Sequence, residues 1–394
     1  MRALWLTSSY PRHAGDHAGI FLHRWAKGLV SRGAEVRVIA PGWKDAPGRE
    51  RLDGVEVIRF PYVWPRRLER LAYGDAGMMV GFGHDRAAAA QLVPFAASMA
   101  WNAVALAGEA DLLHAFWTPM GAVALLAGAL RRKPVVLSPL GTDLRALPPS
   151  FNRAVIRRAR AIVAGGGPGT EVHDRLTEMT AKPLHRIFLP LDEAGLEAGD
   201  GDAFRREFGI KDERVVSFIA RMYDLKDPWT MLDAAALLVA RRPATKVVFV
   251  GDGPLLRSLR EVAKSRGLAR DTIFTGARGD VGSILRASDV FVSLNLVDNC
   301  WATTIAEAMF LRVPCVVSNG GPEGELFPHG EAAWLVPQRD PQALALVLDG
   351  ILGDGELASR LAEGGRALLE GHRRRDDLIL DDTLELYEGV THGH

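Results

Sequence analysis

Two basic residues in the second half of the chain are spaced to neutralise a diphosphate. Arg221 and Lys226 follow the apolar run 215–220, which predicts a buried strand of a parallel sheet. Ligands of such sheets bind just beyond the carboxyl ends of the strands. Arginine offers a fork of N–H donors and lysine a point charge, so the pair can share the negative charge of a departing phosphate group.

A carboxylate and two glycines lie further along the chain, around a second predicted strand. Glu307 lies in a predicted helix that Thr303 or Thr304 can cap, and its carboxylate can accept hydrogen bonds from hydroxyl groups. After a short β-branched strand, Gly320 and Gly321 form a turn whose backbone amides can face an anion. A carboxylate and an anion-binding turn together suit a ligand with hydroxyls at one end and phosphate at the other. A sugar nucleotide is such a ligand.

The elements that must position these residues alternate between strands and helices in both halves of the chain. In the first half, the strand 4–7 is followed by a loop that ends at Gly19, the helix 20–30 and the strand 35–39. The loop lacks the G-x-G-x-x-G fingerprint, which argues against a dinucleotide site. The alternation predicts two similar α/β domains with doubly wound parallel sheets rather than a barrel.

The chain resembles the retaining glycosyltransferases of family 4, which have the GT-B fold. The resemblance rests on the Arg-x-x-x-x-Lys spacing and on the motifs Glu307-Ala308-Met309, Gly320-Gly321-Pro322-Glu323 and Gly251-Asp252-Gly253-Pro254. It covers nearly the whole chain. It implies two Rossmann-like domains that face a central cleft, with a last helix that crosses back to the first domain.

The resemblance also implies roles for individual residues. Arg221 and Lys226 would neutralise the leaving nucleotide and Glu307 would hold the ribose hydroxyls, so that no metal ion is required. The donor would be a UDP- or GDP-linked sugar, bound as a substrate, with no further cofactor. The other residues placed at the donor are Gly19, Gly251, Gly253, Pro254, Arg278, Thr303, Thr304, Gly320 and Gly321.

The sugar side of the expected site departs from the family pattern at two positions. A family glutamate falls at Asn299, where an amide can hold hydroxyls, and the nearest carboxylate is Asp298. A family histidine falls at Leu140, and His114, at the end of a neighbouring predicted strand, is the nearest candidate to replace it, although a lone histidine is often structural. Asp143 can hold a hydroxyl of sugar or acceptor, so His114 and Asp143 join the candidate catalytic residues.

The boundary between the two domains is predicted in residues 191–203, an acidic, glycine-rich stretch without periodicity. We expect an acceptor-side domain over residues 1–192, onto which residues 375–394 pack back. The nucleotide-sugar-binding domain is expected over residues 193–374. Residues 61–83, rich in aromatic side chains and arginine, are the predicted acceptor region, because variable loops on a rigid sheet carry specificity.

The composition restricts partners and compartment. The formal net charge is +0, so nothing favours a nucleic-acid partner. Cys300 and Cys315 lack a CxxC spacing, which argues against a disulfide framework or a zinc site and favours a reducing cytoplasm. The apolar stretch 87–106 contains polar residues and a proline, so we interpret it as a buried or interfacial helix rather than a membrane span. A peripheral role at the inner face of a membrane stays open.

The leading hypothesis is a cytoplasmic, retaining, metal-independent glycosyltransferase that acts on a polysaccharide, lipid-linked or natural-product acceptor. The runner-up is a non-catalytic homologue of the same fold that binds nucleotide sugars or acts as a scaffold. A third alternative is an epimerase or a phosphorylase on the same fold. Donor consumption separates them, because a scaffold consumes no donor and an epimerase needs no acceptor.

Overall fold

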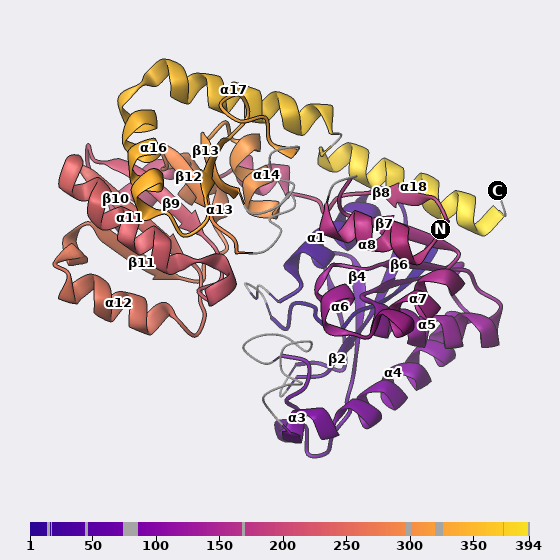
Figure 1. Ribbon diagram of the computed structural model, residues 1–394. Coiled ribbons are helices and arrows are strands. Elements are labelled where there is room, and N and C mark those ends of the chain that lie inside the picture. Colours follow the sequence, from indigo (N-terminus) through magenta and orange to yellow (C-terminus); the bar gives the residue numbers. More distant parts are fainter. Residues whose placement is uncertain are drawn as a thin grey trace. The chain divides into compact units, whose positions relative to one another are not determined.

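The computed structural model divides the chain into two α/β units, each built around its own sheet (Figure 1). It describes residues 1–13, 16, 18–43, 46–73, 86–167, 170–296, 302–319, 326–372 and 374–392. Unit 1 comprises Met1–Pro190 and Asp376–His394, and unit 2 comprises Leu191–Arg375. The chain therefore returns to unit 1 with its last helix.

Unit 1 has, in the described part of the chain, an eight-stranded sheet in the order β3-β4-β2-β1-β5-β6-β7-β8. All neighbouring strands are parallel except β3 and β4. The strands are β1 Arg2–Leu6, β2 Glu35–Pro41, β3 Arg49–Leu52, β4 Val55–Phe60, β5 Leu112–Phe116, β6 Val135–Ser138, β7 Ala161–Ala164 and β8 Leu184–Arg186. The α-helices are α1 Ile20–Ser31, α3 Arg86–Ala90, α4 Leu92–Ala107, α5 Thr118–Arg131, α6 Thr142–Ala146, α7 Pro149–Arg158, α8 Glu171–Met179 and α18 Asp376–His392.

Unit 2 has, within its described residues, a six-stranded parallel sheet in the order β11-β10-β9-β12-β13-β14. The strands are β9 Arg214–Ile219, β10 Thr245–Val250, β11 Thr272–Gly276, β12 Val290–Ser293, β13 Cys315–Asn319 and β14 Trp334–Pro337. The α-helices are α9 Glu193–Glu197, α10 Gly201–Glu207, α11 Pro228–Arg241, α12 Leu256–Ser265, α13 Val281–Arg286, α14 Thr303–Phe310, α16 Pro341–Gly353 and α17 Gly355–Gly371.

Both sheets are buried along their central strands. Val216 and Phe218 of β9 and Val290 and Val292 of β12 have no exposed surface, and each belongs to the apolar core of unit 2. Near-continuous apolar strands are typical of parallel sheets that are covered on both faces. The predicted donor-binding residues of unit 2 lie outside these apolar strands, in the segments that follow them.

Two expectations about the elements are wrong, and the stretch predicted to hold the domain boundary has helical structure. Residues 191–203 include α9 and the start of α10, because Asp192 and Asp200 each accept a hydrogen bond from a backbone N–H of the first helical turn. The last strand before this region is β8, whereas residues 187–190 lie outside it. The apolar stretch after residue 86 forms two helices, α3 and α4, instead of one. No described helix is long and apolar enough to cross a bilayer.

Candidate functional site

Most of the predicted donor-binding residues follow the carboxyl ends of the strands of unit 2. After β9 come Arg221 and Lys226, after β10 come Gly251, Gly253 and Pro254, after β11 comes Arg278, and after β12 comes α14 with Thr303, Thr304 and Glu307. Because the strands are parallel, these residues lie along one edge of the sheet. Asp298, Asn299, Gly320 and Gly321 lie outside the described residues.

The strand order reverses between β9 and β12, and hydrogen bonds join the loops at this point. The Leu296 N–H donates to the Leu225 carbonyl over 2.9 Å. The Asn295 N–H donates to Ser318 Oγ over 2.9 Å, and Gln338 Nε2 donates to the Asn295 carbonyl over 2.6 Å. These polar residues tie the ends of several strands together. Sequence reasoning missed them, although each lies at or just after the end of an apolar run.

The loop after β9 exposes Arg221 beside a buried anchor. The Met222 side chain is fully buried, its N–H donates to the Asp252 carbonyl over 2.9 Å, and its carbonyl accepts from the Leu255 N–H over 3.0 Å. The Arg221 side chain is exposed, with its guanidinium carbon 6.0 Å from the centre of the Tyr223 ring. A fixed backbone with an exposed cation is suited to contact an anionic ligand.

Lys226 is positioned by the turn that starts the next helix. It ends the 3₁₀ turn Asp224–Lys226, and its N–H donates to the Tyr223 carbonyl over 2.9 Å. Asp227 has a left-handed backbone with φ 48°, and α11 begins directly after it with Pro228. The half-buried side chain of Lys226 therefore extends from a hydrogen-bonded turn at the same sheet edge as Arg221.

The two glycines after β10 allow this turn to pack closely on the Arg221 loop. A Cβ atom on Gly251, whose φ is 134°, would lie 1.9 Å from the Ala220 carbonyl oxygen. A Cβ atom on Gly253, whose φ is 153°, would lie 2.5 Å from the Met222 carbonyl oxygen. Both distances are too short for any side chain. Within unit 2 the glycines therefore position Arg221 through backbone packing.

Replacing Gly253 by alanine is expected to destabilise unit 2 by about 1–3 kcal/mol and to displace the Arg221 loop. We expect weaker binding of a nucleoside diphosphate in calorimetric titration. The matched control is Gly267→Ala, because Gly267 also has a positive φ, 78°, but no heavy atom within 4 Å of its Cβ position. Equal effects of the two substitutions on nucleotide binding would contradict the positioning role.

Glu307 lies in α14, with only 3% of its surface exposed. α14 follows β12 in the chain and packs against β12 and β13. The expected capping of this helix by Thr303 or Thr304 is wrong: the N-cap residue is Ala302, and no side chain caps the helix. Thr303 and Thr304 are half-buried residues of the first turn.

The side chain of Arg278 forms contacts within unit 2 that give it a structural role. Its guanidinium donates to both carboxylate oxygens of Glu207, over 2.7 and 2.9 Å, and to both of Asp280, each over 2.8 Å. It also lies 5.4 and 5.5 Å from the ring centres of Phe204 and Phe208. The hydrogen bonds to these carboxylates raise the pKa of Arg278. The side chain thus joins α10 to the loop after β11, and these intramolecular contacts occupy the guanidinium that was expected to contact the donor.

His114 is buried inside the sheet of unit 1, and its expected contact with the sugar is wrong. The residue has no exposed surface, and burial lowers its pKa to about 3. Its Nδ1 lies 2.5 Å from Tyr387 Oη, and its Nε2 lies 2.7 Å from Ser138 Oγ. Trp5 Nε1 donates to the same Tyr387 oxygen over 3.0 Å. Every polar atom of this group is satisfied if Tyr387 donates to Nδ1 and the neutral ring donates from Nε2.

Replacing Tyr387 by phenylalanine is expected to destabilise unit 1 by about 1–3 kcal/mol, because Trp5 and His114 would keep buried polar atoms without a partner. Thermal unfolding measures the loss. Thr391→Val is the control, since Thr391 lies on the same helix and bonds only to backbone carbonyls and the adjacent His392. An unchanged melting temperature in Tyr387→Phe would contradict the prediction.

Asp143 is also a structural residue in unit 1, so its expected substrate contact is a further error. It is fully buried, and its carboxylate accepts from the Thr118 N–H over 2.7 Å and from the Leu140 N–H over 3.2 Å. Burial raises the pKa of this carboxyl group. Because Thr118 is the first residue of α5, Asp143 caps that helix from a distant part of the chain. Gly19 is likewise buried, and it directly precedes α1.

The two tyrosines in the described part of the predicted acceptor region are packed against other residues. Tyr62 is buried beside Phe95, with 5.2 Å between ring centres, and Tyr73 Oη donates to the Tyr10 carbonyl over 3.1 Å. The Arg12 guanidinium lies 5.0 Å from the Tyr73 ring centre. Trp64, in contrast, is 85% exposed. Among the aromatic residues that suggested an acceptor site, this tryptophan is therefore the most accessible described one.

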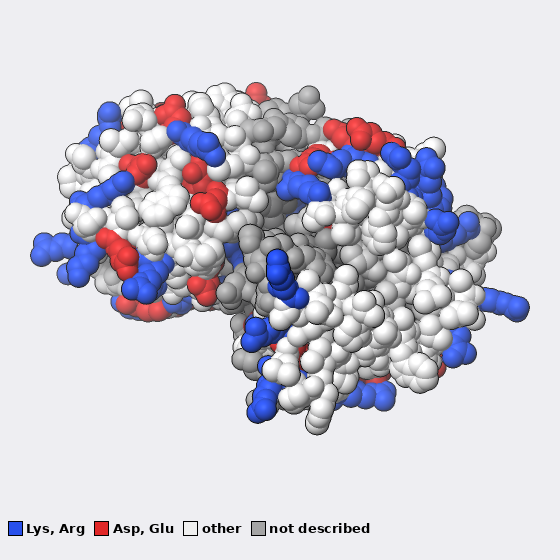
Figure 2. Space-filling view, turned by 60° about the horizontal axis from the view of Figure 1, so that its bottom comes forward, with Lys and Arg blue, Asp and Glu red and all other residues white. Residues whose placement is uncertain are grey.

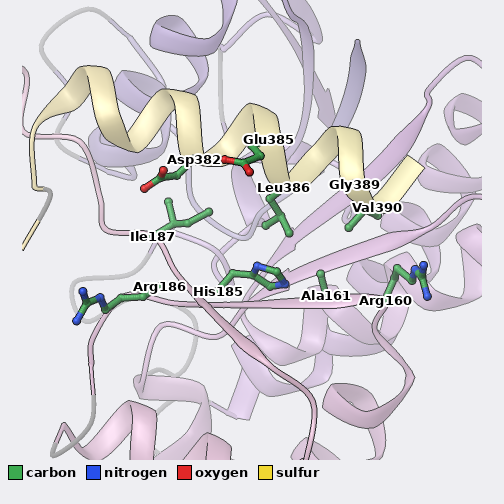
Figure 3. A pocket seen from close by; sticks show the side chains of 10 residues that line it. All are labelled: Arg160, Ala161, His185, Arg186, Ile187, Asp382, Glu385, Leu386, Gly389 and Val390. Carbon is green, nitrogen blue, oxygen red and sulfur yellow. The ribbon is translucent and has the colours of Figure 1, made fainter. Parts of the chain in front are cut away.

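A cavity of about 590 Å³ lies elsewhere in unit 1 (Figure 3). Asp382 and Glu385 of α18 line one side, and Arg160, His185 and Arg186 line the other. None of the predicted site residues lines it. In the described ranges, no group of three or more His, Cys, Asp or Glu side chains could hold a metal ion.

Comparison with known proteins identifies the family. Residues 18–190 match the family model described as a glycosyl transferase 4-like domain, and residues 200–368 match the model described as glycosyl transferases group 1. The two matches fall in unit 1 and unit 2, respectively. The chain belongs to the family 4-type glycosyltransferases, so the expected family and enzyme class are confirmed.

Individual relatives agree with this family. The chain is 24% identical over 279 residues to N-acetyl-alpha-D-glucosaminyl L-malate synthase of Bacillus anthracis, and the aligned region covers 68% of this chain and 72% of the relative. It is 26% identical over 373 residues to the putative teichuronic acid biosynthesis glycosyltransferase TuaC of Bacillus subtilis (strain 168), where the aligned region covers 88% of this chain and 87% of the relative.

A solved structure supports the fold. The crystal structure of Anabaena HepE in complex with UDP and glucose matches with a TM-score of 0.75 and 20% identity, covering 99% of this chain and 100% of that chain. Together with the two parallel-sheet units, this confirms the expected GT-B fold.

Proposed function

We propose that the chain transfers a sugar from a UDP- or GDP-linked donor to a polysaccharide, lipid-linked or natural-product acceptor, with retention of anomeric configuration. Unit 2 would bind the donor and unit 1 the acceptor. The observation that carries the proposal is the edge of the second sheet, where Arg221 and Lys226 share one loop. The Leu296–Leu225 hydrogen bond joins this loop to the chain that leads to Glu307.

The chemistry proposed for this edge is charge neutralisation. The bond between the anomeric carbon and the diphosphate oxygen breaks, and its electron pair stays on the diphosphate. Arg221 and Lys226 face that developing charge, and preorganised groups of this kind are usually the largest catalytic contribution. These two cations supply what a metal ion would otherwise provide, which is the reason for proposing metal independence.

The acceptor completes the reaction from the face that the diphosphate leaves, as the resemblance to retaining enzymes implies. Its hydroxyl oxygen bonds to the anomeric carbon, and its proton passes to the departing phosphate, the nearest base on that face. Glu307 holds the ribose hydroxyls of the nucleotide. Asp298 and Asn299 are proposed to contact the sugar, and Gly320 and Gly321 the diphosphate.

A calorimetric titration with UDP, GDP and a panel of their sugars tests the donor proposal. We expect one nucleotide to bind, with additional affinity for one of its sugars. Donor consumption is then measured with and without candidate acceptors, and NMR of the product gives its anomeric configuration. Binding without any consumption would favour the non-catalytic alternative, and consumption that needs no acceptor would favour an epimerase.

Removal of divalent cations is expected to leave turnover unchanged, because Arg221 and Lys226 are proposed to carry the charge of the leaving group. Initial rates are compared before and after dialysis against excess chelator. Addition of Mg²⁺ or Mn²⁺ to the dialysed enzyme is the control. A rate that falls with the chelator and returns with the cation would refute metal independence.

A further inference from the structure

Two neighbouring helices of unit 1 expose large apolar side chains. α4 carries no charged residue, and α5 carries none before its last residue, Arg131. α4 packs along α5. On α4, Val93 is 76% exposed and Trp101 is 78% exposed, and on α5 Leu130 is 62% exposed. Large apolar residues that gather on a surface without charges mark an interaction site.

A third segment extends the same surface. Ser98 Oγ of α4 donates to the Pro61 carbonyl over 2.7 Å, and Gln91 Nε2, just before α4, donates to the Leu68 carbonyl over 2.7 Å. These bonds hold residues 61–68 against the first half of α4. The segment contributes Trp64, which is 85% exposed. We call the surface formed by Trp64, Val93, Trp101, Leu126 and Leu130 the apolar face.

Basic residues flank the apolar face at both ends. Arg131 Nε donates to the Val104 carbonyl of α4 over 2.8 Å, which places the end of α5 beside α4, and the exposed Arg132 follows. The exposed basic residues of the segments at the other end are Arg67, Arg70 and Arg86. In Figure 2 the surface of unit 1 that faces the viewer is largely uncharged, with blue side chains along its margins and red ones mainly at its upper edge.

The described acidic residues near these segments in the sequence are buried or paired with other residues. Glu69, between Arg67 and Arg70, is buried and lies 3.9 Å from Arg66. Glu109 and Asp111, between α4 and β5, form ion pairs with Arg37 and Arg2, respectively. α4 itself offers no carboxylate, and neither does α5. The apolar face is therefore bordered by positive charge.

We propose that the apolar face docks this enzyme on a bilayer that contains anionic lipids. Trp101, Val93 and Leu130 enter the headgroup region, where tryptophan is favoured because its ring is apolar and its N–H is polar. Arg131 and Arg132 lie at the level of the lipid phosphates, to which basic side chains are attracted. The proposed contact is with the surface of the bilayer, where exposed apolar side chains on surface helices enter the headgroup region.

A bilayer fits this face better than a second copy of the chain does. A symmetric dimer would pair the same patch with itself, so the basic margins of the two copies would approach each other. Like charges in that arrangement oppose association. An anionic lipid surface instead offers apolar and negatively charged groups together, which matches the distribution of side chains on the apolar face.

Flotation with lipid vesicles tests the proposal, using vesicles of phosphatidylcholine with and without phosphatidylglycerol. We expect the chain to float with the anionic vesicles and much less with the neutral ones. Trp101→Glu and Leu130→Glu should each weaken this partitioning about tenfold, because each removes apolar surface from the bilayer and adds a negative charge. Arg132→Gln should weaken it about fivefold.

The matched controls lie in unit 2. Leu346 on α16 is 54% exposed, similar to Leu130, so Leu346→Glu should float like the unchanged chain. Arg257 is exposed on α12, and Arg257→Gln controls for the loss of one positive charge. Thermal melting establishes that the variants are folded.

Three results would overturn the proposal: no flotation of the unchanged chain, equal flotation on neutral and anionic vesicles, or a dimer in sedimentation that Trp101→Glu dissociates. The last would assign the apolar face to a second copy. The assay contains no donor and no acceptor, so its outcome is independent of the proposed transfer reaction.

Discussion

Replacing Lys226 by alanine is expected to lower turnover about 10²- to 10³-fold while the chain stays folded. Lys226 ends the 3₁₀ turn Asp224–Lys226 and is held there by backbone hydrogen bonds, so removal of its side chain leaves the turn in place. The ammonium group is proposed to face charge that grows on the diphosphate as the bond breaks. Its loss should therefore raise the barrier more than it weakens binding of the donor.

The measurement is steady-state kinetics with the donor found by calorimetry. We expect a fall in kcat that exceeds the change in KM, which is the pattern for an interaction made mainly in the transition state. Lys264→Ala is the control, because Lys264 is an exposed lysine on α12 of the same unit. A Lys226→Ala enzyme with unchanged turnover would refute the role of this residue, and a changed KM alone would reduce it to donor binding.

The sequence predicted which residues lie at the edge of the second sheet, because this position depends only on neighbouring residues in the chain. A polar residue just after an apolar run lies at the carboxyl end of a buried strand, and parallel strands bring such ends together. Arg221 and Lys226 meet this condition, and the structure places both in the loop after β9. The glycine turn after β10 was also recognisable, although its contact with Met222 depends on a neighbouring strand.

His114 was misjudged because the predicted strand was too short. The prediction ended the strand at His114, whereas β5 continues to Phe116 and pairs His114 with Trp5 on one side and Val136 on the other. A residue at the end of a strand can reach a ligand, but a residue two positions inside it is enclosed by its neighbours. The partner that satisfies its ring, Tyr387, comes from the last helix.

Asp143 and Arg278 show a second limit of prediction from the sequence, because a partner of each side chain lies far away along the chain. Asp143 caps α5 through Thr118, and Arg278 is bound by Glu207, in each case a partner from another element. Aspartate and arginine are residue types common in binding sites. Only the fold shows that the side chains of these two residues already form hydrogen bonds within the protein. Conversely, Asp192 and Asp200 are local helix caps in a stretch whose composition predicted a domain boundary without helical periodicity.

Acid is expected to destabilise unit 1 through His114 by about 1.4 kcal/mol for each pH unit below about 6. Burial lowers the pKa of this histidine to about 3, whereas an unfolded chain has a value near 6.5. Between these values the unfolded state binds a proton that the folded state does not. The contribution of His114 to stability is therefore complete above pH 6.5 and is lost as the pH falls toward 3.

The groups that face His114 do not compensate for this loss. Tyr387 is the titratable one, and burial raises its pKa, so that it stays protonated throughout this range. Trp5 and Ser138, the other polar neighbours, do not titrate. Protonation of the ring would add a donor at Nδ1, opposite a hydroxyl that already donates to it. The proton must then break the hydrogen-bond chain that joins α18 to the sheet.

Urea unfolding at pH 6.5, 5.5 and 4.5, followed by hydrogen exchange of peptides from β5 and α18, measures this effect in unit 1 alone. His114→Gln is the matched variant, because an amide offers one acceptor and one donor group and does not titrate. The variant should be less stable at pH 6.5 but should lose less stability on acidification, by about 1.4 kcal/mol per pH unit. Parallel pH dependences of the two proteins would show that His114 exchanges protons with solvent in the folded state, and its assignment to the core would then fail.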